Sequence, residues 1–178
     1  MTKRERGEVE IQRRYYAQTA SSYDSMHVDV DEEHGVALAF LLAAIDLLQV
    51  KSILDIGSGT GRVIARLNEA RADVFVLGIE PVAELRAVAY EKGIAKERLV
   101  DGDVLALEFG EGAFDMVCEF GVLHHIRRPA RAVAEMLRVS KRAIFISDSN
   151  NFGQGSPASR ILKQALNCLL YTSPSPRD

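Results

Sequence analysis

The chain has 178 residues, enough for one domain with a substantial core and too few for two comfortable ones. Apolar residues make up 47% and charged residues 26%, a balance typical of a soluble globular protein and not of a disordered one. The formal net charge is -3, and Lys and Arg are scattered among Asp and Glu, which argues against a nucleic-acid surface and favours a small-molecule partner.

Residues 1–50 are predicted to form an N-terminal helical cap made of two helices. The opening MTKRERGEVE is charged with no apolar segment behind it, so it is not a secretory signal, and we expect a cytoplasmic protein. The run VALAFLLAAI (36–45) is half the length that a bilayer span needs, which predicts a core helix and no membrane span. The acidic stretch HVDVDEEH (27–34) fits no metal-loop spacing, so it is interpreted as a solvated helix start.

From residue 52 onward, short β-rich runs alternate with helical patterns, which is typical of a parallel sheet covered on both faces. Right-handed crossovers then predict an α/β fold: a three-layer, doubly wound, mostly parallel sheet of the Rossmann-like type with strand order 3-2-1-4-5. The predicted strands are SILDI (52–56), VFVLGIE (74–80), RLVDG (98–102), FDMVCEF (114–120) and AIFISD (143–148).

The first strand runs into a glycine-rich loop, ILDIGSGTG, which lets a ligand lie against main-chain atoms. A dinucleotide fingerprint needs a third glycine at the position of Arg62, and a phosphate-binding P-loop needs a Lys and a Ser or Thr that are absent. Asp55, at the end of the strand, would repel a pyrophosphate placed over the loop. The loop therefore favours a cationic ligand over a dinucleotide.

ILDIGSGTG resembles the first motif of the class I S-adenosylmethionine-dependent methyltransferases, and residues 15–151 supply the later motifs of that family in order. The resemblance implies that Glu80 accepts both ribose hydroxyls, and that Asp103 accepts the adenine amino group while Val104 offers a backbone donor. Asp101 competes with Asp103 for that role, and a turn formed by DGD accounts for both acids without a ligand.

The fourth strand ends in CEFGVLHHI, similar to the VLHH signature of the small-molecule methyltransferases of this class. By that resemblance the backbone near Glu119 and Phe120 faces the methionine portion of the cofactor, and Phe120 contacts the sulfonium. His124, His125 and Asp148 are weak candidates for a general base, needed only if the acceptor must lose a proton. The alternative is that both histidines are capping or loop residues, and no metal site is expected.

The segment RRYYAQTASSYDSM is similar to the N-terminal lid of quinone and related methyltransferases, which would place Tyr23 in an aromatic wall over the sulfonium. The alternative is that Tyr15, Tyr16 and Tyr23 only pack the first helix on the sheet. The cofactor-binding residues predicted from the resemblance are Asp55, Gly57, Ser58, Gly59, Gly61, Glu80, Pro81, Asp103, Val104, Glu119, Phe120 and Tyr23.

The last eleven residues, CLLYTSPSPRD (168–178), match one reading frame of a transposase adapter used in sequencing libraries, and a disordered Ser/Pro tail is the alternative. We therefore expect residues 51–167 to be an incomplete S-adenosylmethionine-binding domain without the family's final two strands. The function expected is methyl transfer from S-adenosylmethionine to a small molecule. The alternatives are an NAD-dependent oxidoreductase and a non-catalytic module that binds S-adenosylmethionine.

Overall fold

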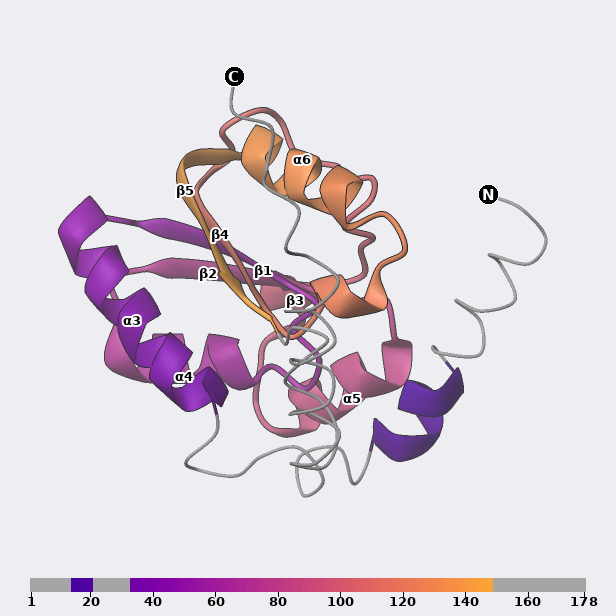
Figure 1. Cartoon of the computed structure of the whole chain (residues 1–178). Helices are drawn as coiled ribbons and strands as arrows, with labels where there is room; N and C mark the ends of the chain where they lie inside the picture. The colour runs from indigo at the N-terminus through magenta and orange to yellow at the C-terminus, as the bar shows by residue number, and fades with distance from the viewer. Residues whose placement is uncertain (1–13, 21–32, 149–178) are drawn as a thin grey trace, which may run out of the picture. The chain divides into compact units, whose positions relative to one another are not determined.

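The computed structural model describes residues 14–20 and 33–148 of the chain, and the described residues up to Ser147 belong to one compact unit (Figure 1). Their centre is a five-stranded sheet in the order β3-β2-β1-β4-β5, and every neighbouring pair of strands is parallel. The predicted Rossmann-like sheet and its strand order are confirmed.

The strands are β1 (Ser52–Ile56), β2 (Phe75–Ile79), β3 (Leu99–Val100), β4 (Phe114–Phe120) and β5 (Ser140–Ser147). The helices are α3 (Glu33–Leu48), α4 (Arg62–Ala70), α5 (Ala83–Glu91) and α6 (Pro129–Val139), with two short 3-10 helices, η2 (Lys96–Arg98) and η3 (Leu123–His125). Residues 14–19 are also helical.

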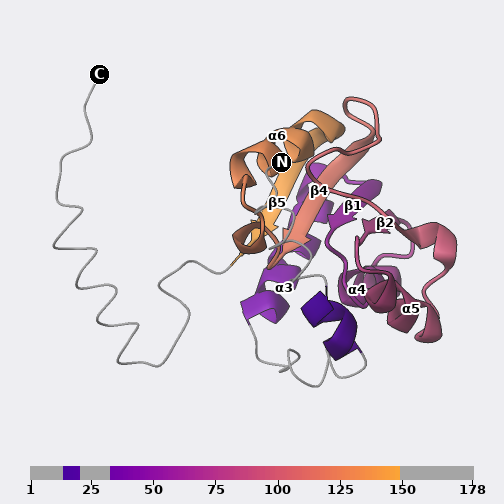
Figure 2. The same ribbon diagram turned by 90° about the vertical axis from the view of Figure 1, so that its right-hand side faces the viewer.

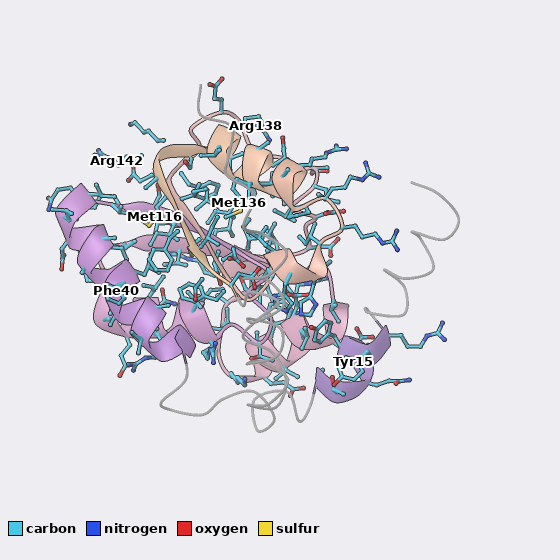
Figure 3. The ribbon with its side chains drawn as sticks, in the orientation of Figure 1. Tyr15, Phe40, Met116, Met136, Arg138 and Arg142 are labelled. Atoms are coloured by element: carbon cyan, nitrogen blue, oxygen red, sulfur yellow. The ribbon has the colours of Figure 1, made fainter. Side chains whose placement is uncertain are left out.

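Two apolar clusters fill the space on the two faces of the sheet, with α3, α4 and α5 on one side and α6 on the other (Figures 1 and 2). Met116 of β4 belongs to the cluster under α3 and α4, whereas Met136 belongs to the cluster under α6 (Figure 3). Burial of such clusters contributes roughly 25 cal/mol per Å² of apolar surface, so the two layers hold the strand ends in fixed positions.

Two of the five strands, β1 and β4, have the predicted bounds, and the others differ at their ends. The third predicted strand, β3, pairs with β2 over only two positions, Gly78 with Leu99 and Ile79 with Val100, because the chain then turns away through Gly102. β5 begins three residues before the predicted start, because α6 ends at Val139 and the chain continues directly in an extended conformation.

Only one side of α3 is in the core. Leu41 and Ile45 are buried, but Phe40 (labelled in Figure 3) is 67% exposed and Leu47 is 82% exposed. The expectation of a core helix is therefore right for one face and wrong for the other. None of the helices in the described part of the chain is long and apolar enough to cross a membrane.

Some predictions fall outside the described residues. These are the lid residue Tyr23, the acidic stretch up to residue 32, Asn150 and Asn151 beyond β5, and the whole Ser/Pro-rich end of the chain. They remain predictions.

Candidate functional site

The predicted cofactor residues meet at one edge of the sheet, where the order of the strands reverses. β1 lies between β2 and β4, and the chain crosses from one half of the sheet to the other between β3 and β4. Ligands of open α/β sheets bind outside the carboxyl ends of the strands at such a switch point. Asp55 of β1, Glu80 after β2 and Glu119 of β4 all lie there.

The three predicted loop glycines have backbone conformations that other residues rarely adopt. The φ angles are 64° at Gly57, 54° at Gly59 and 78° at Gly61. A Cβ at position 57 would lie 2.5 Å from Val122 Cγ2, and one at position 61 would lie 2.9 Å from Ile94 Cγ1. The loop is thus pressed against the segment that follows β4, and glycine is required there.

A fourth glycine, which the sequence reading did not single out, fixes the other side of the loop. Gly78 of β2 lies under Ser58, and a Cβ on Gly78 would come within 2.2 Å of Ser58 Oγ. Ser58 donates its backbone N–H to Ile79 O at 3.0 Å and its hydroxyl to Asp55 O at 3.0 Å. A glycine inside a strand is itself a signal of close backbone approach, so the sequence did carry this information.

Glu80 connects β2 to the glycine loop through its carboxylate. It is 5% exposed, and its Oε2 accepts the N–H of Gly59 at 3.0 Å while its Oε1 accepts the N–H of Val82 at 2.9 Å. The acid expected to hold the ribose is therefore buried, oriented by backbone donors and next to the loop.

Asp55 is 1% exposed, and only one of its two oxygens has a described hydrogen bond. Cys118 of β4 donates its thiol to Oδ1 at 3.6 Å, a weak bond, whereas no donor among the described residues reaches Oδ2. Burial raises the pKa of Asp55 to about 7; the Glu80 carboxylate adds to this rise, while Ser58, Cys118 and Arg62 oppose it. The same burial, with the Asp55 charge beside it, raises the pKa of Cys118 well above its usual value.

The two acids proposed for the adenine have different partners. Asp101 accepts an N–H of Arg86 at 2.7 Å, and the same guanidinium nitrogen donates to the backbone oxygen of Glu80. Asp103 is exposed and accepts the N–H of Leu105 at 2.9 Å, which is the turn that the DGD pattern predicts. Arg86 thus holds Asp101 to the end of β2, although the side chain of Asp101 is 74% exposed, and both acids are accessible to a ligand.

Glu119 lies at the end of β4, opposite Ile56 of β1, and is fully buried. Its Oε2 accepts the N–H of Val122 at 2.8 Å, so the side chain closes the turn that leads to the two histidines. The ring of Phe120 lies 5.7 Å from the ring of Phe145 on β5. Both predicted residues therefore shape the β4 end of the site.

The two histidines lie in η3, and their rings are in contact, with centroids 3.8 Å apart. The 3-10 turn thus brings the side chains of these two adjacent residues together. His125 Nε2 is 2.8 Å from the hydroxyl of Tyr16, a partner 109 positions earlier in the chain. Asp148 follows β5 directly and is the last described residue.

The described N-terminal segment, residues 14–20, packs on the beginning of α5. Ala20 is buried against Val82 and Leu85, and Tyr16 packs against the same cluster. Val82 is buried in this contact, while Pro81 before it, predicted to line the cofactor, is half-buried. The segment is therefore in contact with the residues that follow Glu80.

The methyltransferase domain family matches residues 54–145, from β1 into β5. An uncharacterized methyltransferase of Schizosaccharomyces pombe is 29% identical over 140 residues, which cover 71% of this chain and 48% of that protein. A demethylmenaquinone methyltransferase of Roseiflexus castenholzii is 30% identical over 139 residues, covering 75% of this chain and 57% of that protein.

Solved structures agree with this assignment. The plantazolicin methyltransferase BpumL, solved with a desmethylPZN analog and SAH, has a TM-score of 0.62 at 17% identity and covers 94% of this chain and 78% of that one. The YcgJ protein of Bacillus subtilis has a TM-score of 0.55 at 25% identity, covering 76% and 58%.

The chain belongs to the methyltransferase domain family and has the fold of the class I S-adenosylmethionine-dependent methyltransferases. The family match does not favour the NAD-dependent alternative. The chain spans about half the length of the first two curated relatives that it matches, 48% and 51% of them.

Proposed function

We propose that this protein binds S-adenosylmethionine at the carboxyl ends of β1, β2 and β4 and transfers its methyl group to a small molecule in the cytoplasm. The observation that carries the proposal is the buried carboxyl of Asp55, whose Oδ2 has no donor among the described residues. A buried carboxylate without a donor costs several kcal/mol, which a cationic ligand offsets. The cofactor's ammonium group fits that oxygen, whereas a dinucleotide phosphate does not.

The other parts of the cofactor fit acids and backbone at neighbouring strand ends. Glu80 is oriented by two backbone donors, and a carboxylate there is suited to accept from the two ribose hydroxyls. Asp103 and Val104 follow β3, where the adenine edge would lie, and Asp101 is paired with Arg86. The residues proposed to line the cofactor are Asp55, Gly57, Ser58, Gly59, Gly61, Glu80, Pro81, Asp103, Val104, Glu119 and Phe120, together with Tyr23 outside the described residues.

Bound S-adenosylmethionine would supply a methyl group on a positively charged sulfur, which needs little covalent help from the protein. The chain's own residues bind, align and keep water away from the reactants. His124, His125 and Asp148 are the candidates for removing a proton from an acceptor that carries one. Residues 1–50 are proposed to serve as the lid.

The acceptor proposed for the first assay is a reduced demethylmenaquinone. Its support is the group of relatives named demethylmenaquinone methyltransferases, of which the Thermobifida fusca protein is 35% identical over 105 residues. Those residues are 43% of that relative, so the acceptor belongs to the proposal and not to the family assignment.

Titration calorimetry with S-adenosylmethionine and with S-adenosylhomocysteine tests the cofactor half of the proposal. We expect both to bind, and Glu80→Gln to weaken binding by about tenfold or more, because charge-assisted bonds to hydroxyls contribute roughly 1.5–3 kcal/mol each. Glu69→Gln is the matched control, since Glu69 is exposed on α4 and pairs with Arg66. Binding of neither compound, or equal losses in the two variants, would overturn the proposal.

A further inference from the structure

The N-terminal segment, residues 14–20, touches both sides of the glycine loop. On one side it packs on Val82 and Leu85, which follow the ribose acid at the end of β2. On the other side Tyr16 reaches His125 in the loop after β4. Because β1 lies between β2 and β4 in the sheet, a segment in contact with both must pass over the end of β1, where the glycine loop begins.

The contact between Tyr16 and His125 has the geometry of a hydrogen bond and of an aromatic pair. The Tyr16 hydroxyl lies 2.8 Å from Nε2, and the two rings meet edge to face with centroids 5.8 Å apart. A phenol is a better donor than acceptor, and a neutral imidazole nitrogen is a better acceptor than a phenol oxygen. Tyr16 therefore donates its proton to Nε2, and the neutral ring carries its own proton on Nδ1.

His125 is in turn fixed to the cofactor end of β4 by the backbone. Its N–H donates to Val122 O at 3.0 Å, and Val122 packs on the glycine loop where a Cβ at Gly57 would clash. Glu119 accepts the N–H of the same Val122. The imidazole is thus held against the loop by the main chain, and it is met from the opposite side by the hydroxyl of Tyr16.

We propose that Tyr16 and His125 form a proton relay for methyl transfer, and that the acceptor is therefore a small molecule with a hydroxyl or amine proton on the methylated atom or conjugated to it, as in a reduced quinone. As the acceptor takes the methyl group, this bond to hydrogen breaks and the proton passes to the Tyr16 oxygen. The proton of Tyr16 passes to His125 Nε2. The positive charge lost from the sulfur of the donor reappears on the imidazolium, so atoms and charge balance.

This inference rests on the proposed function, which supplies the methyl donor, and adds the acceptor class and the role of Tyr16. It also explains the length of the N-terminal contact. The apolar packing on Val82 and Leu85 positions the Tyr16 backbone, so that the hydroxyl lies within hydrogen-bonding distance of His125.

The first test is nitrogen-15 NMR of the histidine rings in the complex with S-adenosylhomocysteine, which needs no acceptor. In the wild-type chain we expect the His125 ring to carry its proton on Nδ1, and in Tyr16→Phe to revert to the ordinary mixture dominated by the Nε2–H form. Tyr15→Phe is the matched control, because Tyr15 is 50% exposed and contacts the ring of Tyr16 without reaching His125. Identical His125 spectra in the wild type and Tyr16→Phe would overturn the inference.

The second test is a double-mutant cycle on turnover with the acceptor that the cofactor-bound protein methylates. We expect Tyr16→Phe and His125→Gln each to lower kcat by roughly 100-fold, and the double variant to lose no more than the worse single variant, because one relay is being removed. The affinity for S-adenosylhomocysteine should change by less than about threefold. If the losses in kcat of the two single variants add in the double variant, the contact is structural and not a relay. The same holds if a loss in affinity for the cofactor accounts for the fall in rate.

The two proposals fail in different ways. If S-adenosylhomocysteine does not bind the wild-type chain, the proposed function fails. If it binds and Tyr16→Phe behaves like Tyr15→Phe, only the relay fails.

Discussion

Replacing Asp55 by asparagine should make the protein more stable at pH 8 while weakening its affinity for the cofactor. In the folded protein burial raises the pKa of this carboxyl to about 7, against 3.8 in an unfolded chain. The folded state therefore binds more protons between these two values, so stability is complete below pH 3.8 and falls as the pH rises towards 7. At about 1.4 kcal/mol per pH unit, the ionised group costs roughly 4 kcal/mol at pH 8 and roughly 2 kcal/mol at pH 5.

Asparagine keeps the shape of the side chain and the acceptor for the Cys118 thiol, but it has no charge to bury. Its amide hydrogens have no described acceptor, which costs about 1–3 kcal/mol at every pH. Urea unfolding should thus show Asp55→Asn to be more stable than wild type by about 1–3 kcal/mol at pH 8, and within about 1 kcal/mol of wild type at pH 5. Affinity for S-adenosylhomocysteine should fall by about tenfold or more, because a charge-assisted bond is lost.

Asp73→Asn provides a control of opposite sign. Hydrogen bonds from Arg71 and Lys51 hold the pKa of Asp73 far below its usual value, so its ionised form stabilises the fold and that contribution is lost as the pH falls. The control should be destabilised most at high pH and least at low pH. A stability difference between Asp55→Asn and wild type that is the same at pH 5 and pH 8 would refute the reasoning about the buried carboxyl.

Three further predictions concern the walls of the site. Gly78→Ala should lower the free energy of unfolding by about 1–3 kcal/mol in urea titrations, because its Cβ would fall 2.2 Å from Ser58 Oγ; an unchanged midpoint would contradict this. Asp103→Asn should weaken S-adenosylhomocysteine binding by roughly five- to tenfold in calorimetry, and Asp101→Asn by less than about threefold; the reverse order would assign the adenine contact to Asp101. Arg138→Ala should lower the free energy of unfolding by more than Arg66→Ala does, since Arg138 (Figure 3) donates to two carbonyls of the loop before β4 at 2.7 and 2.9 Å whereas Arg66 is exposed; an equal or smaller loss would refute it.

The centre of the sheet could be predicted because β1 and β4 are mostly buried and read as apolar runs between glycines and turns, whereas β5 has no buried residue. β1 and β4 match their predicted bounds since packing of Leu54 and Val117 on one face, and of Ile53 and Met116 on the other, leaves no freedom of register. β3 was predicted three residues too long, because pairing ends where its neighbour β2 ends, and no local pattern records the length of a partner strand.

The positions of the acids expected to bind the cofactor were predictable from residue type and spacing, but their burial and hydrogen-bond partners were not. The sequence shows an acid after each of two strands, and it cannot show that Glu80 accepts two backbone N–H groups while Asp55 lacks a donor at Oδ2 among the described residues. That difference arises from Cys118, which faces Asp55 across the β1–β4 pair and brings only a weak donor. The pKa of Asp55 is therefore raised mainly by burial, and the weak donor on β4 only partly opposes the rise.

The contact between Tyr16 and His125 lies furthest from what local pattern can reveal, since 109 positions separate the two residues. The two residues belong to segments that the sequence marks separately, a tyrosine-rich helix and a VLHH turn. Neither segment alone shows whether Tyr16 only packs against its neighbours or also takes part in the reaction. The strand order brings the two segments together: β1 lies between β2 and β4, so a helix that packs after β2 and bonds after β4 lies near the switch point of the sheet. Packing alone does not require a tyrosine hydroxyl at hydrogen-bonding distance from an imidazole, and the comparison of Tyr16→Phe with Tyr15→Phe separates the two roles.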